Sequence, residues 1–124
     1  DVDEMGVALE PLSADEKARL GIPYGLTVKA IRNGKMQKAG VTKGTIILAV
    51  NDMQMETPQD WENAVKQANQ SPDRTIWIKA IAPSGRKQGF VIDLNEILHN
   101  IKFYHKANLY KQQPTRFVKL PAAN

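Results

Sequence analysis

The alternation of apolar and polar residues predicts a chain built largely from short β-strands. Residues 6–12 and 26–31 alternate with a period of two, which is typical of strands that bury one face. Residues 45–50 form an uninterrupted apolar run, which predicts a strand covered on both faces. Alternation over 76–94, broken by a turn at 83–85, predicts a β-hairpin.

Two helices are predicted from their capping residues. Ser13 is followed by a carboxylate three positions later, which is the pattern of a capping box, so a helix is expected over 14–20. Thr57 precedes a proline, and apolar residues then recur at helical spacing, which predicts a longer helix over 58–69. In this helix Trp61 is expected to face the core.

The predicted elements are expected to share one core. Their order is strand, short helix, strand, a helical turn near 35–40, strand, small strand, longer helix and hairpin. This order favours the α+β class with mainly β content, as a partly open β-barrel of five to six strands capped by two helices. Pro11 cannot donate a backbone hydrogen bond, so the strand over 6–12 is expected at a sheet edge.

Charge divides the chain into a body and a tail near Asn95. The 124 residues carry a net charge of +4, yet residues 97–124 contain five basic residues and no acidic one. We therefore expect one domain over 1–96 and a basic extension over 97–124, either natural or non-native, with a short helix followed by irregular chain. A solvated or self-packing extension is favoured over an arm that binds nucleic acid or lipid headgroups.

Several function classes lack the residues that they need. The body has no histidine, so none of its serines can form a serine–histidine triad, and His99 and His105 lack the spacing of a zinc helix. The absence of cysteine excludes disulfides and thiolate metal sites. No catalytic residue, metal or cofactor is expected, and no apolar run is long enough to span a membrane.

Two segments resemble a known family. Residues 21–28 and the segment 38–52, followed by the helix after Thr57, are similar in sequence, order and spacing to a bacterial-type PDZ domain. The placement of the hairpin after the long helix resembles the circularly permuted PDZ domains of HtrA/Deg-type serine proteases, in particular their C-terminal PDZ domain. The chain departs from the family pattern at Thr45 and Asp52, where aspartate and glycine are usual.

The resemblance implies a peptide site. Carried over to this sequence, backbone N–H groups of a loop at 24–26 bind a peptide carboxylate, although Pro23 before them supplies no N–H. The peptide adds as a strand beside 26–31, against the helix 58–69. The expected loop residues are Tyr24, Gly25 and Leu26, and the expected groove residues are Leu26, Thr27, Val28, Pro58, Glu62 and Val65.

The resemblance also implies a role for the whole protein. A PDZ module of this kind captures C-terminal or extended apolar peptide segments, such as the ends of unfolded proteins, for a periplasmic serine endopeptidase of protein quality control. Its expected partners are such peptides, the protease domain and neighbouring subunits, without nucleic acid and without a membrane span. Two alternatives remain open: a scaffold or oligomerisation PDZ domain without a substrate role, and an electrostatic binder that acts through the basic tail.

Overall fold

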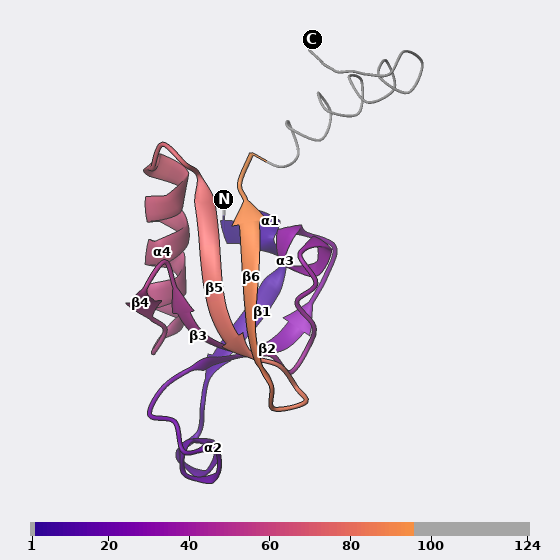
Figure 1. The fold of residues 1–124 in the computed structure, drawn as a ribbon, viewed down its shortest axis with the longest axis vertical. Helices are drawn as coiled ribbons and strands as arrows, with labels where there is room; N and C mark the ends of the chain where they lie inside the picture. The colour runs from indigo at the N-terminus through magenta and orange to yellow at the C-terminus, as the bar shows by residue number, and fades with distance from the viewer. Residues whose placement is uncertain (1, 96–124) are drawn as a thin grey trace. The chain divides into compact units, whose positions relative to one another are not determined.

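The computed structural model describes residues 2–95, in which the strands form one antiparallel sheet of six (Figure 1). The predicted extension 97–124 lies outside the described residues, and the boundary near Asn95 stays a prediction. The elements are α1 (Val2–Met5), β1 (Val7–Pro11), α2 (Ala14–Leu20), β2 (Leu26–Ile31), α3 (Lys35–Lys38), β3 (Ile46–Val50), β4 (Met53–Gln54), α4 (Pro58–Gln70), β5 (Thr75–Ile81) and β6 (Lys87–Asp93).

The strands are arranged in the order β1-β2-β3-β5-β6, and β4 pairs with β3 outside this row. Among the described residues, β1 and β6 are therefore the two ends of the row. Pairing between β5 and β6 is regular along the whole hairpin, from Thr75 opposite Asp93 to Ile81 opposite Lys87. Strand β1 lies at the sheet edge as its proline predicts, which confirms that part of the sequence interpretation.

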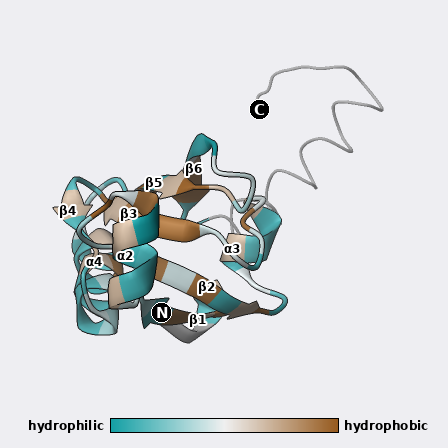
Figure 2. Cartoon of the chain, turned by 90° about the horizontal axis from the view of Figure 1, so that it is seen from below, coloured by the Kyte–Doolittle hydropathy of each residue, from teal (hydrophilic) through white to brown (hydrophobic). Residues whose placement is uncertain are grey.

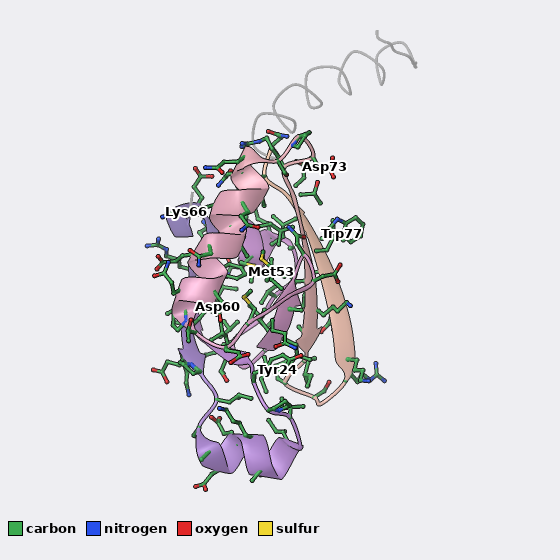
Figure 3. All side chains as sticks on the ribbon, turned by 90° about the vertical axis from the view of Figure 1, so that its left-hand side faces the viewer. Tyr24, Met53, Asp60, Lys66, Asp73 and Trp77 are labelled. Atoms are coloured by element: carbon green, nitrogen blue, oxygen red, sulfur yellow. The ribbon has the colours of Figure 1, made fainter. Side chains whose placement is uncertain are left out.

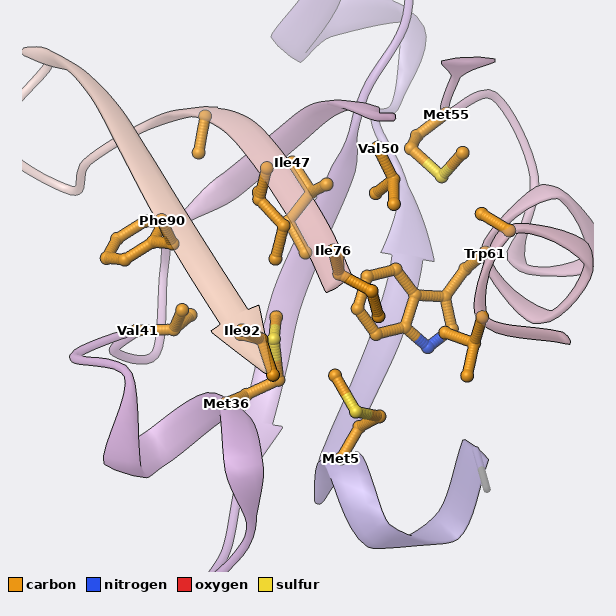
Figure 4. Packing of buried hydrophobic residues seen from close by; sticks show 14 of the residues in the cluster. Met5, Met36, Val41, Ile47, Val50, Met55, Trp61, Ile76, Phe90 and Ile92 are labelled. Carbon is orange, nitrogen blue, oxygen red and sulfur yellow. The ribbon is translucent and has the colours of Figure 1, made fainter. Parts of the chain in front are cut away.

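The core lies between the sheet and α4 (Figure 4). Trp61 projects from α4 into this core and is only 3% exposed, as its spacing predicts. Ile47 and Val50 of β3 and Ile76 of β5 are fully buried around it. Met5 and Met55 also belong to the same cluster, although neither was predicted as a core residue from the sequence. Figure 2 shows brown, hydrophobic segments concentrated on the strands and teal segments on the loops and helices around them.

The capping box predicted at Ser13 forms. The Ser13 hydroxyl accepts a hydrogen bond from the Glu16 N–H at 3.1 Å, and the Glu16 carboxylate accepts one from the Ser13 N–H at 2.8 Å. Helix α2 then ends at Gly21, which adopts a left-handed conformation with φ of 71°. None of the residues of α2 is buried, so this helix is held mainly by its caps and its flanking chain.

The second capping box fixes the start of α4. The Asp60 carboxylate accepts hydrogen bonds from the backbone N–H groups of Glu56 at 2.9 Å and Thr57 at 3.0 Å. These donors hold the pKa of Asp60 below its ordinary value of 3.8. The cap therefore favours the ionised carboxylate, because its negative charge strengthens both hydrogen bonds.

Two local features were not predicted from the sequence. Helix α1 spans only four residues, which is too short for the apolar spacing that predicts a helix. Asn51, at the turn between β3 and β4, bonds to β5 through its side chain: its Oδ1 accepts from the Trp77 N–H at 2.8 Å, and its Nδ2 donates to the Thr75 carbonyl at 3.2 Å. This side chain extends the β3–β5 pairing past the end of the strand.

We predict that Asp60→Asn makes folding stability less dependent on acidic pH. The folded pKa of Asp60 is lowered, so its carboxylate stabilises the native chain above pH 3.8 and this contribution is lost as the pH falls from there through the lower folded pKa. Thermal melts between about pH 2 and 7 should show a gap between the native chain and Asp60→Asn that is largest near neutrality and closes in acid.

Glu62→Gln is the matched control, since it removes a carboxylate from the same helix outside the capping box. If the gap between the native chain and Asp60→Asn stays constant across this pH range, the cap does not depend on the charge.

Candidate functional site

Strand β2 lies in the interior of the sheet, which corrects the peptide site expected beside 26–31. On one side, β2 pairs with β1, with Leu26 opposite Pro11 and Thr27 opposite Glu10. On the other side, β3 pairs with the same two residues of β2. A backbone edge that already carries a partner strand on each side cannot accept a peptide as a further strand. The predicted strand addition beside β2 is therefore wrong.

The loop expected to bind a carboxylate is also occupied by the chain itself. Gly25 is buried, and its carbonyl accepts a hydrogen bond from the Leu12 N–H at 3.1 Å. A Cβ atom built on Gly25 would lie 2.7 Å from a methyl carbon of Ile46, so the glycine is required by internal packing. Tyr24 is partly exposed, and Figure 3 shows it below the sheet on the side of α2.

The predicted groove residues separate into two groups. Leu26, Val28 and Val65 have no exposed surface and belong to the core cluster. Thr27 is buried as well. Pro58 is exposed and Glu62 partly exposed, both on α4. The structure therefore places the strand residues inside the sheet and leaves only Pro58 and Glu62 of the predicted groove residues exposed to a ligand.

The open edge next to α4 belongs to β1. Contacts join α4 to β1, and no described strand pairs with the outer side of β1. The side of β1 that faces β2 is fixed by a hydrogen bond near each end of the strand. The Gly6 carbonyl accepts from the Arg32 N–H at 2.9 Å, and the Leu12 N–H donates to the Gly25 carbonyl. Even-numbered residues of this segment thus direct their backbone groups toward β2.

It follows that Val7, Leu9 and Pro11 direct their backbone groups outward. The register shift between Ala8 and Leu9 leaves its extra residue on β2, so the alternation along β1 is unbroken. Since Pro11 has no N–H, the outward donors are those of Val7 and Leu9. We refer to the outward backbone groups of Val7, Leu9 and Pro11 as the β1 edge. The side chains of Val7 and Leu9 are partly buried and pack against the core.

Glycines hold the start of the β1 edge in place. Gly6 has a φ of 75°, and a Cβ there would lie 2.9 Å from the Arg32 carbonyl oxygen. A Cβ on Gly34 would lie 2.7 Å from the Glu4 carbonyl oxygen. The buried Lys35 ammonium lies 3.9 Å from the Glu4 carboxylate. These contacts attach α1 to the loop before α3 and fix where β1 begins.

The sequence carried a signal for the β1 edge that was not used. Pro11 marks β1 as an edge strand, and an exposed sheet edge is what strand addition needs. The sequence alone did not show that β1 and β3 both pair with β2, because these pairings join residues that are distant along the chain.

Away from the β1 edge, the described part of the chain has a cleft. Its volume is about 590 Å³, and it lies over the β5–β6 hairpin and the turn at Asn51. Trp77, which is 61% exposed, projects outward there on the side of the hairpin away from α4 (Figure 3). In this cleft Lys79 and Asp52 form an exposed ion pair at 3.5 Å. The cleft is separate from the β1 edge and contains none of the predicted site residues.

Within residues 2–95, no cluster of three or more histidine, cysteine, aspartate or glutamate side chains is placed to hold a metal ion. No helix in the same described part of the chain has the length and apolar character needed to cross a bilayer.

Comparison with solved structures identifies the fold. The HtrA-type protease AlgW with a decapeptide matches at 22% identity and a TM-score of 0.55, over 72% of this chain and 27% of that chain. A variant of AlgW, also with a decapeptide, matches over the same shares with a TM-score of 0.60. The PDZ domain of EpsC from Vibrio cholerae matches at 16% identity and a TM-score of 0.51, over 75% of this chain and 98% of that chain.

The chain therefore has a PDZ-like fold that resembles the PDZ region of HtrA-type proteases, as the sequence resemblance predicts. It corresponds to about a quarter of the AlgW chains and to nearly all of the EpsC domain. No family model matches the chain, and no curated protein does.

We predict that Thr27→Val stabilises the fold. The Thr27 hydroxyl is buried and has no hydrogen-bond partner among the described residues, so it bears a desolvation cost that a methyl group would not. The free energy of unfolding, measured by urea denaturation, should rise by about 1 kcal/mol.

Thr75→Val is the control, because its hydroxyl donates to the Asp73 carbonyl at 3.1 Å and its loss brings no such gain. A clear loss of stability in Thr27→Val would show that the hydroxyl is satisfied in solution.

Proposed function

We propose that this chain is a peptide-binding PDZ module that adds an extended peptide as an antiparallel strand on the β1 edge. The observation that carries the proposal is that β1 is a sheet end next to α4, with the backbone groups of Val7 and Leu9 directed outward. Strand addition uses such unpaired donors and acceptors for affinity and side-chain pockets for specificity. The partly buried Val7 and Leu9 side chains supply an apolar surface beside them.

The carboxylate end of the peptide is proposed to lie at the start of β1. Gly6 has no side chain to obstruct an approaching group, and Val7 begins the series of outward N–H groups. On the opposite wall we retain the helix residues Pro58, Glu62 and Val65 from the sequence interpretation. Because Val65 is fully buried, its role is to support this wall from within the core.

The wider role is also a proposal. We infer that the parent protein is a periplasmic HtrA/Deg-type serine endopeptidase and that this domain presents substrate or regulates the protease. The support is the likeness in fold to AlgW, whose structures contain a decapeptide. The domain itself is proposed to be a binding module without catalytic residues, since no body residue forms a serine–histidine pair.

We predict that a peptide of about ten residues with an apolar C-terminal residue and a free carboxylate binds with a Kd of about 1 to 100 μM. Methylating one peptide amide at a time removes one donor at a time. Only every second amide of an added strand faces the protein, so affinity losses should alternate along the peptide. Isothermal titration calorimetry measures each Kd, and NMR shift changes should centre on β1 and α4.

Two controls separate the parts of this proposal. Amidating the C-terminus tests the carboxylate position alone, and Thr27→Val should bind the unmodified peptide with unchanged affinity because Thr27 is not at the β1 edge. Shift changes centred on β2 and β3, or N-methyl losses without alternation, would contradict strand addition on β1.

A further inference from the structure

The second sheet end, β6, is a regular backbone edge. The Leu94 N–H donates to the Arg74 carbonyl and the Arg86 carbonyl accepts from Ala82, both at 2.8 Å, so the even-numbered residues at the two ends of β6 face β5. The β5–β6 register contains no shift, so the alternation holds along the whole strand. The odd-numbered residues therefore direct their N–H and C=O groups away from the sheet, and these are Lys87, Gly89, Val91 and Asp93.

We propose that β6 pairs antiparallel with β6 of a second copy of this chain, around a two-fold axis at Phe90. In this register Lys87 lies opposite Asp93 of the second copy, and Gly89 lies opposite Val91. All four pairs join residues whose backbone groups point outward, so each can exchange both hydrogen bonds. The contact is isologous, since each copy offers the same surface to the other.

The charges on β6 match those of a second β6 in this antiparallel register. They do not match in parallel pairing or in an antiparallel register shifted by two residues. Strand β6 begins with the cation Lys87 and ends with the anion Asp93. Antiparallel pairing about Phe90 sets opposite charges against each other at both ends. Parallel pairing in register would set lysine against lysine and aspartate against aspartate, and an antiparallel shift by two residues would remove both charge pairs. Charge thus selects both the direction and the register.

The exposed apolar side chains support the same contact. Trp77 is 61% exposed and Val91 52% exposed, and they are two of the three large hydrophobic residues exposed in the described part of the chain. They lie directly opposite each other on β5 and β6. In the proposed pair, Val91 lies opposite Gly89 of the second copy. Because glycine has no side chain, it leaves room beside Val91. The Trp77–Val91 pairs of both copies then gather on one face around the axis, which reduces the apolar area that meets water.

The proposed contact is compatible with peptide binding, because it uses the sheet end opposite to β1. It does not rest on the proposed peptide function. One pair of short strands buries a small interface, so we expect weak association with a Kd of about 0.1 to 1 mM.

The test is sedimentation velocity on the full 124-residue chain at concentrations from about 10 μM to 1 mM. Lys87→Glu and Asp93→Lys each create two like-charge pairs across the axis and should each weaken dimerisation about tenfold or more. An equimolar mixture of these two variants restores both attractive pairs, so it should dimerise as the native chain does. Lys66→Glu, with the same charge change on the exposed side of α4, should leave association unchanged.

Gly89→Pro is a second variant that tests dimerisation if Asp93→Lys does not fold. Proline there removes an outward N–H that β5 does not use, so the sheet is retained while dimerisation is lost. Circular dichroism confirms the fold of each variant. The proposal is overturned if the native chain stays monomeric at 1 mM, or if its dimer is insensitive to Lys87→Glu and Gly89→Pro. A mixture of folded charge variants that fails to dimerise would also overturn it.

Discussion

The pairing of β2 on both sides is the constraint on which the rest of this structure depends. Every backbone N–H and C=O in a sheet interior needs a partner, and β2 finds its partners in β1 and β3. This pairing buries Leu26 and Val28 and leaves β1 and β6 as the two ends of the row β1-β2-β3-β5-β6. The place where a further strand can add is thus decided by sheet order rather than by a loop motif.

The two sheet ends differ in ways that suit different partners. Strand β1 spans five residues and ends in a proline, which limits the length over which it can pair, and it lies beside α4, which can form a second wall. Strand β6 is regular along seven residues, with opposite charges at its two ends. A short peptide held between strand and helix suits β1, whereas a symmetric pairing with an identical strand suits β6.

Local structure was largely predictable from the sequence because its causes are local. Ser13 and Thr57 begin helices where their side chains can accept the first free N–H groups, and Trp61 turns inward because it lies on the apolar stripe of α4. The site was not predictable in the same way. Whether Gly6 or Gly25 stands before the open strand depends on which strands become neighbours, and this is set by pairings between distant segments. The family resemblance identified the fold, but it assigned the peptide to a strand that lies inside the sheet.

The central claim, that β1 is the open edge and β2 is not, is tested most directly by amide hydrogen exchange followed residue by residue with NMR. In the free chain, the amides of Val7 and Leu9 should exchange fast while those of Ala8 and Glu10 are protected by β2. Saturation with a binding peptide should then protect Val7 and Leu9. Equal protection of all four amides before peptide is added, or new protection only at Leu26 and Thr27, would contradict the account.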